Sequence, residues 1–251
     1  MLDLIPLSAR PDLADRLFAP AIQGLWPEFM RHDPTAGLYF DAPHFDACRD
    51  TAFAILDPAD PRIPVGRAFA VPFAFGEAVG RSELPDSGWD GVIRWAHEDR
   101  ALGHERNAVS ALEITLLPRY RGRGASSVIL KAMAAEVRRL GYGQFFAPVR
   151  PTAKHLEPFT PIADYVARQT GDGLPQDPWL RVHVRAGGRI VKVAPTSMVV
   201  TGTIADWSRW TSMTFATSGQ HAVPGALVPV HISLEQDQGA YIEPNVWIQH
   251  A

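Results

Sequence analysis

The sequence predicts an α/β fold in which helices flank a mixed sheet, with parallel strands near the centre of that sheet. The main observation is the order of elements over residues 111–149, which read as an apolar strand, an amphipathic helix and a second apolar strand. A strand, helix and strand unit of this length forms a right-handed crossover between parallel strands. Residues 226–248 read as two apolar strands around a polar turn, which predicts a terminal antiparallel hairpin. With 251 residues and 46% hydrophobic content, the chain has enough apolar material for a single domain over residues 1–251.

The composition argues against several classes of protein. The formal net charge of −3 argues against a nucleic-acid-binding surface. Cys48 is the single cysteine, so the chain forms no internal disulfide and suits a reducing cytoplasm. The first residues lack the basic start and apolar run of a secretory signal, and no stretch approaches the roughly eighteen apolar residues of a membrane span. We therefore expect a cytoplasmic protein with neither nucleic acid nor membrane as a partner.

Residues 1–110 are expected to hold the first helices and strands. Apolar residues at spacings of mostly three and four predict an amphipathic helix over 11–31, broken near Pro20. The remaining elements expected in this part are a helix over 43–53, a strand over 63–75 with an edge position or bulge at Pro72, and a short helix over 92–98.

The run His97, Glu98 and Asp99 contains residue types that bind metals. Adjacent residues on a helix point in different directions, so three ligands from this run would not converge on one ion. The chain also lacks a pair of cysteines with metal-type spacing. We therefore expect no metal site.

Residues 109–117 are expected to form the strand that leads into the most informative turn. Strict alternation would place Glu113, Thr115 and Leu117 on one face, and Leu112, Ile114 and Leu116 on the other. A carboxylate in a central strand is rare unless it is paired or functional, and burial would raise its pKa towards that of a useful base. Two interpretations of Glu113 stay open: a general base, or an acid neutralised by a neighbouring arginine.

The turn after this strand has the chemistry of an anion site. Gly122 and Gly124 can adopt backbone angles closed to other residues and bring N–H groups close to a ligand. Ala125 and Ser126 then open a helix over 125–140, whose free N–H groups and dipole favour a phosphate. The three arginines of the turn are Arg119, Arg121 and Arg123. A Walker loop would need Lys followed by Ser or Thr after Gly124, and a Rossmann loop would need a third glycine, so neither pattern is met.

The stretch LLPRYRGRGASSVIL, residues 116–130, resembles the acetyl-CoA signature of the GCN5-related N-acetyltransferases. That signature is a strand ending in x-Pro-x-Tyr, then Arg/Gln-x-x-Gly-x-Gly/Ala, then a helix. The resemblance implies a sheet whose parallel central strands splay apart, with the pantetheine arm of CoA between them. It also implies that acetyl-CoA or a related acyl-CoA is the co-substrate, and that Ser126 stands where the family usually has Gly or Ala. The residues it assigns to the co-substrate are Leu117, Arg121, Gly122, Arg123, Gly124, Ala125 and Ser126, with a backbone N–H near Leu117 holding the oxyanion.

After the strand expected over 144–149, residues 150–176 form a long loop rich in Pro and Gly, which suits a lid or a wall of the acceptor site. Asp177-Pro178 predicts a helix start, although an alternating strand is the competing interpretation. As a helix, HVRAGGRI aligns with the family stretch Tyr-x-x-x-Gly-Phe. His183 then takes the place of the tyrosine that protonates the CoA thiolate in many relatives. Tyr165 is the second candidate for that role, and a histidine packed in the core is the alternative for His183.

The last part of the chain exceeds the minimal domain of the resembled family. A strand over 189–193, a segment around 197–200 and a helix over 204–210 capped by Thr203 precede the hairpin. If residues 111–195 form the acyl-CoA-binding core, residues 196–251 complete the sheet or form the edge of a homodimer. A contribution to the acceptor pocket is the third option.

The resemblance implies direct transfer of an acetyl or related acyl group from acyl-CoA to the amine of a small molecule. Direct transfer needs no nucleophile from the enzyme, so Cys48 has no covalent role. Three alternatives stay open: an enzyme of the same fold that uses longer acyl groups, one that decarboxylates an acyl thioester, and a non-catalytic CoA-binding module.

Overall fold

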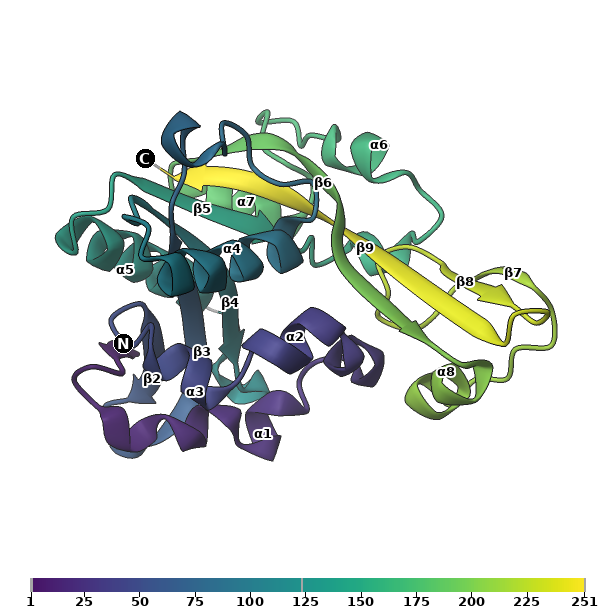
Figure 1. Ribbon diagram of the computed structural model, residues 1–251, viewed down its shortest axis with the longest axis horizontal. Coiled ribbons are helices and arrows are strands. Elements are labelled where there is room, and N and C mark those ends of the chain that lie inside the picture. Colours follow the sequence, from purple (N-terminus) through teal and green to yellow (C-terminus); the bar gives the residue numbers. More distant parts are fainter. Residues whose placement is uncertain (1, 123, 251) are drawn as a thin grey trace.

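A mixed nine-stranded sheet runs through the molecule, with the strand order β1-β2-β3-β4-β5-β9-β8-β7, and β6 also pairs with β9 (Figure 1). The computed structural model describes residues 2–122 and 124–250. The strands are β1 Asp3–Pro6, β2 Ala52–Asp57, β3 Asp60–Phe73, β4 Ala108–Leu116, β5 Gln144–Val149, β6 Gly188–Gly202, β7 Gly219–His221, β8 Val230–Ser233 and β9 Gln238–His250. Neighbouring strands are antiparallel except β4 and β5, which are parallel. The predicted fold class, a mixed sheet with parallel central strands and flanking helices, is confirmed.

Helices cover both faces of this sheet (Figure 1). The α-helices are α1 Pro20–Gln23, α2 Pro34–Tyr39, α3 Ala42–Asp46, α4 Gly88–Leu102, α5 Ala125–Arg139, α6 Ile162–Val166, α7 Pro178–Arg185 and α8 Ile204–Thr211. The 3-10 turns are η1 Pro11–Leu13, η2 Asp15–Phe18, η3 Glu28–His32, η4 Glu77–Val79, η5 Pro118–Tyr120 and η6 Lys154–Leu156. None of the described helices is both long and apolar enough to cross a membrane.

The two faces of the sheet bury separate apolar cores. On one face, α4 packs Val92 and Ile93 against strand residues such as Phe146. On the other face, α5 packs Leu130 and α7 packs Leu180 against β5. The two faces are called the α4 face and the α5 face below.

Strands β4 and β5 pair only at their beginnings. Ala108, Val109 and Ser110 pair with Gln144, Phe145 and Phe146, and no further pairs follow. The predicted parallel crossover is therefore present, and the strands separate beyond Ser110. The separation leaves an opening in the middle of the sheet.

A bulge in this region overturns the strict alternation expected for β4. The pairing with β3 shifts between Phe69 and Ala70, so Phe69 opposes Glu113 whereas Ala70 opposes Ala111. As a result, Leu112 lies in the core of the α4 face, while Ile114 packs with the core of the α5 face. An extra residue in one strand changes which side chains share a face.

Several local predictions hold because capping chemistry determines the ends of helices. The side chain of Asp177 accepts hydrogen bonds from the N–H groups of Trp179 and Leu180, which fixes the start of α7 and excludes the competing strand. Thr203 and Asp206 form a reciprocal capping box at the start of α8. The terminal hairpin is also present, as β8 and β9.

Other predictions near the N-terminus are wrong. Residues 11–31 form short turns and the single-turn helix α1, because Pro11, Pro20 and Pro27 each interrupt a continuous helix. Helix α3 ends at Asp46, and the strand β2 follows where the helix was expected to continue. Later in the chain, the strand expected over 189–193 is present, but it continues through the segment 197–200 as one long strand, β6, which has register shifts against β9.

Long strands β6 and β9 extend past the rest of the sheet to a lobe that carries α8, β7 and β8 (Figure 1). Its core includes Trp207, Tyr241 and Val230, which pack with Phe29 and Met30 of η3. The N-terminal segment is thereby fixed against the C-terminal lobe, on the α4 face, beside the opening between β4 and β5.

Candidate active site

A cavity of about 680 Å³ passes through the opening between β4 and β5. On the α5 face its wall includes Ser126, Leu130 and His183, whereas Trp26 and Phe40 line it on the α4 face. Both sides of the sheet therefore contribute to one continuous space. Two reactants could enter from opposite faces and meet in the gap.

The predicted anion turn lies at the α5 end of this cavity. Gly122 and Gly124 have φ angles of +80° and +75°, in the left-handed region that favours glycine. A side-chain carbon added to either glycine would meet no atom within 4 Å, so open space lies beside the turn. Gly124 is the N-cap of α5, which begins at Ala125. An anion placed here faces the positive end of a helix of 15 residues.

The remaining residues assigned to the co-substrate differ in their placement. Arg121 and Ser126 line the cavity. The Arg121 Nε donates to the carbonyl of Leu116 at 2.8 Å, which holds the guanidinium at the end of β4. The N–H of Leu117 itself donates to the carbonyl of Val65 at 2.9 Å and is not free to hold an oxyanion, so the backbone N–H expected near Leu117 for this role stays a prediction. Arg123 lies outside the described residues.

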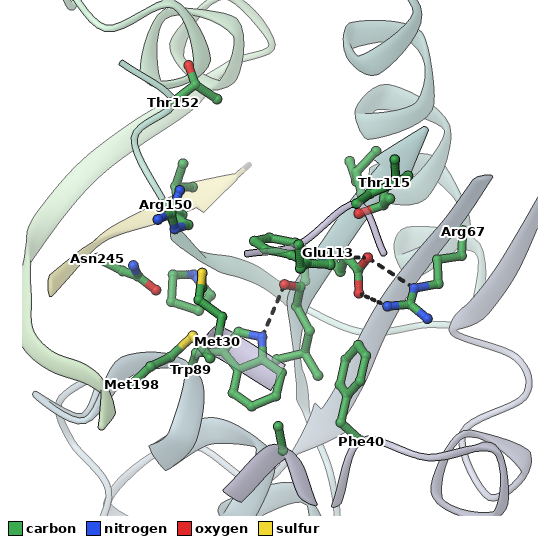
Figure 2. Close-up of a pocket in the computed structure, with 18 of the residues that line it drawn as sticks. Met30, Phe40, Arg67, Trp89, Glu113, Thr115, Arg150, Thr152, Met198 and Asn245 are labelled. Carbon is green, nitrogen blue, oxygen red and sulfur yellow. Dashed lines mark hydrogen bonds and ion pairs between the residues drawn. The ribbon is translucent and has the colours of Figure 1, made fainter. Parts of the chain in front are cut away.

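Glu113 lies in the wall of the cavity and is paired with Arg67. The Arg67 Nε is 3.0 Å from Glu113 Oε1, and the Arg67 Nη2 is 3.0 Å from Glu113 Oε2 (Figure 2). The indole Nε1 of Trp26 donates to Oε1 at 3.0 Å. Only 1% of the Arg67 side chain and 3% of the Glu113 side chain are exposed. The contacts therefore match the second interpretation of Glu113, an acid neutralised by an arginine.

Arg67 itself is held on every side. Its guanidinium lies 5.2 to 5.3 Å from the ring centroids of Phe18, Phe40 and Phe69, and its Nη1 donates to the carbonyl of Leu17 at 2.9 Å. Aromatic faces attract a cation that has lost its water. Sequence reasoning missed Arg67, although a lone arginine in the otherwise apolar strand expected over 63–75 was a signal that an acid lies nearby.

His183 lies in the wall of the cavity near the start of the gap. Its ring packs edge-on against Trp179 with centroids 4.5 Å apart, and only 2% of the residue is exposed. Its Nδ1 is 2.9 Å from Nε2 of His250, the last described residue of β9. Burial and the neighbouring imidazole lower the pKa of His183 to about 3, and burial lowers the pKa of His250 to about 4. Both rings are therefore neutral near pH 7, with one hydrogen between them.

Tyr165 does not lie in the wall of this cavity. Its hydroxyl donates to Oδ2 of Asp177 at 2.8 Å, and the same carboxylate caps α7. Burial and this hydrogen bond raise the pKa of the Tyr165 hydroxyl. The contacts support a structural role for Tyr165, tying the loop over 150–176 to α7, better than a role as acid.

A second arginine, the half-buried Arg150, follows β5 and lines the cavity opposite Glu113 (Figure 2). Its Nε donates to both carboxylate oxygens of Glu243 at 3.0 and 2.9 Å. Sequence reasoning missed this pair as well. An acid within the apolar run of residues 240–248 was the available signal.

Two carboxyl groups, Asp33 and Asp90, share a buried position between α2 and α4. They are 1% and 5% exposed, and one oxygen of each, Asp33 Oδ2 and Asp90 Oδ1, is buried without a hydrogen-bond partner among the described residues. Burial and the charge of Asp33 raise the pKa of Asp90 to about 9, and burial raises the pKa of Asp33. One proton shared between the two groups explains how both can be buried without a cation.

The chain was compared with protein families, with known proteins and with solved structures. No family model matches the chain. The chain is 27% identical, over 271 aligned positions that cover 97% of it and 91% of the relative, to an arginine N-acetyltransferase, avaD, of Aspergillus versicolor.

Two solved structures share the fold over the whole chain. The loading GNATL domain of CurA from Lyngbya majuscula has a TM-score of 0.59 at 14% identity, with 100% of this chain and 97% of that domain covered. The GphF GNAT-like decarboxylase, solved with isobutyryl-CoA, has a TM-score of 0.55 at 19% identity, with 100% and 98% covered. The splayed parallel strands, the glycine turn that opens α5 and these likenesses agree. The chain therefore has the fold of the GCN5-related N-acetyltransferases, which bears out the resemblance seen in residues 116–130.

Proposed function

We propose that the chain transfers an acetyl or related acyl group from acyl-CoA to the amine of a small molecule, by direct attack in a ternary complex. The observation that carries the proposal is the continuous cavity through the gap between β4 and β5. It connects an anion turn on the α5 face with a separate chamber on the α4 face. The likeness to an arginine N-acetyltransferase supports an amine as the acceptor.

The residues on the α5 side suit acyl-CoA. Gly122 and Gly124 leave open space beside the start of α5, and Arg121 adds a guanidinium at the cavity wall. These groups would hold the diphosphate. Beyond Ser110 the edge of β4 that faces β5 has no strand partner, so its backbone can bind an amide-containing arm. When bound, acyl-CoA supplies the thioester carbonyl and the thiolate leaving group.

Glu113 is a poor candidate for removing the proton of the amine directly. Both of its oxygens already accept hydrogen bonds from Arg67, and Oε1 also accepts one from Trp26, so neither oxygen is free to approach the amine. We assign Glu113 a positioning role, in which it fixes Trp26 and Arg67 at the wall of the acceptor chamber. The amine proton then leaves to water.

His183 is the residue we propose to act on the leaving group. Its Nδ1 is engaged with His250, so Nε2 is the nitrogen available to the cavity. A neutral ring with its hydrogen on Nε2 would donate a hydrogen bond to the sulfur as the C–S bond breaks, and so stabilise the thiolate, which then takes its proton from water. Since its pKa is about 3, this contribution does not titrate between pH 5 and 8.

The test is turnover of acetyl-CoA with a panel of amines, followed by release of free thiol. His183→Phe should lower kcat about 100-fold while changing the affinity for acetyl-CoA less than about threefold. His155→Phe, at an exposed histidine that contacts the Thr152 carbonyl, is the matched control. Wild-type turnover in His183→Phe would return His183 to a purely structural role.

The same assay separates the alternatives. Release of carbon dioxide from a carboxyacyl-CoA without any amine would identify a decarboxylase. Binding of CoA with no turnover over the whole panel would identify a non-catalytic module. A cytoplasmic location and a homodimer stay predictions, and light scattering of the purified chain tests the second.

A further inference from the structure

Arg150 lies on the acceptor side of the cavity. Along β5, Phe145, Ala147 and Val149 pack in the core of the α5 face, and Phe146 packs in the core of the α4 face. Alternation places Arg150 on the same side as Phe146. Figure 2 shows Arg150 and Asn245 on one side of the cavity, opposite Glu113 and Arg67. A molecule that enters from the α4 face therefore meets Arg150.

The Arg150 guanidinium is fixed by buried neighbours. Its Nε contacts both oxygens of Glu243, and its Nη2 donates to the carbonyl of Gly225 at 2.5 Å. Glu243 is fully buried and also accepts from the Tyr241 hydroxyl at 2.6 Å and from the Asn245 amide at 3.2 Å. The orientation of the guanidinium is thus set before any ligand binds, which reduces the entropy lost on binding.

One nitrogen of Arg150 is not used by the fold. Nη1 makes no hydrogen bond to the part of the chain that the structure describes, while 20% of the Arg150 side chain is exposed. The other guanidinium in the acceptor chamber, Arg67, has both Nη atoms engaged. Arg150 therefore offers two N–H donors in a site sheltered from water, where charge-assisted hydrogen bonds are strongest.

Charge balance also favours an anionic group at this position over a cationic one. Besides the Arg150 Nε, Glu243 accepts hydrogen bonds from two further donors, the Tyr241 hydroxyl and the Asn245 amide. Its oxygens lie behind Arg150 and are fully buried, so a ligand cation cannot reach them. The group that a ligand can reach is therefore the Arg150 guanidinium, which only donates hydrogen bonds.

We infer that Arg150 binds a carboxylate of the acceptor, so that the acceptors are amino acids or compounds with an equivalent acid group, rather than simple amines. The inference rests on the proposed function. It deepens that function by naming the group that separates good acceptors from poor ones.

The experiment compares amino acids with the amines that lack only the carboxylate. Arginine with agmatine, and phenylalanine with phenethylamine, are assayed at saturating acetyl-CoA. A charge-assisted hydrogen bond contributes about 1.5 to 3 kcal/mol, so kcat/KM for the preferred amino acid should exceed that of its amine about 10- to 100-fold. The amide of the same amino acid, which keeps the skeleton but not the charge, should behave like the amine.

Arg150→Lys keeps a positive charge opposite Glu243, so the fold should survive, but it removes the free Nη1 donors. The amino acid should lose its advantage, while the KM for acetyl-CoA and the rate with the amine stay within about threefold of wild type. Arg49→Lys, at the exposed pair with Asp46 and outside the cavity wall, is the control and should keep the preference. An equal kcat/KM for acid and amine in the wild type, or an unchanged ratio in Arg150→Lys, would overturn the inference.

Failure of the proposed function gives a different result. If no member of the panel is acetylated, calorimetry with CoA present still compares binding of the amino acid and its amine. Tighter binding of the amino acid that Arg150→Lys abolishes would support the carboxylate site in a protein without transferase activity. Equal binding of the two compounds would reject it.

Discussion

Breaking the pair between Arg67 and Glu113 should strongly destabilise the protein. Arg67→Met removes both contacts at 3.0 Å and leaves Glu113 with the Trp26 hydrogen bond alone, in a site where 3% of its side chain is exposed. Leaving one buried charge without its partner costs about 3 to 5 kcal/mol. For a chain of this size that corresponds to a fall in Tm of roughly 10 °C.

A second substitution should recover most of this loss. Arg67→Met combined with Glu113→Leu replaces the pair by apolar side chains of similar volume, and such replacements are often neutral or stabilising. The indole of Trp26 loses its acceptor in the double variant, which costs about 1 kcal/mol. The double variant should therefore be more stable than Arg67→Met by at least about 2 kcal/mol.

Urea unfolding followed by tryptophan fluorescence measures these differences. The control is Arg139→Met, which breaks the exposed pair with Glu136 on α5 and should cost less than about 0.5 kcal/mol. Equal costs for Arg67→Met and Arg139→Met would refute the reasoning, because the buried pair would then behave like a solvated one. A double variant no more stable than Arg67→Met would refute the account of the unpaired carboxylate.

Acid should weaken the fold through His183 and His250, whose pKa values are about 3 and about 4 in the fold and about 6.5 in the unfolded chain. The unfolded chain binds more protons below pH 6.5, so stability present above that pH is lost as the pH falls, by about 2 kcal/mol per histidine at pH 5. Urea titrations at pH 7 and 5 measure the loss, and equal stability at both would contradict it. Gly124→Trp should lower acyl-CoA affinity at least about 100-fold in calorimetry, at a folding cost of about 1 to 2 kcal/mol from its positive φ. Gly141→Trp, with φ of +89° and open space at the other end of α5, should cost as much and leave affinity unchanged. Asp90→Asn should stabilise the protein, because the unfolded carboxyl loses its proton above about pH 4 whereas the folded one keeps it to about pH 9. The gain should be larger at pH 8 than at pH 5 by about 1 kcal/mol or more, and a loss of stability at pH 8 would count against a shared proton.

The elements around the anion turn could be predicted because several local signals agree there. The strand expected over 109–117 is β4 Ala108–Leu116, and the helix expected over 125–140 is α5 Ala125–Arg139. Glycines with positive φ angles stand at the turn between them. Capping by Asp177 fixed α7 in the same way, since the cap involves residues only two and three positions away.

The contacts that shape the site are not local, which is why sequence reasoning missed most of them. Arg67 and Glu113 are 46 residues apart, and His183 and His250 are 67 apart. Their meeting depends on strand pairing and on the bulge opposite Glu113, which no periodicity reveals. The sequence indicated that Glu113 in β4 is unusual, but it did not identify Arg67 as its partner.

The two arginine and glutamate pairs offer a reason why the cavity stays open. Apolar walls facing each other across a gap gain by collapsing and excluding water. Here each wall carries a charged pair closed upon itself: Arg67 with Glu113 beside β4, and Arg150 with Glu243 beside β5 and β9. Because each charge already has its partner on its own wall, closing the gap would bring neither pair a new favourable contact. The double variant Arg67→Met with Glu113→Leu should therefore fold well yet lose turnover, because its apolar side chains can collapse into the acceptor chamber and fill it. A gain in stability at the expense of activity is expected when a charged pair in a functional site is replaced by apolar residues.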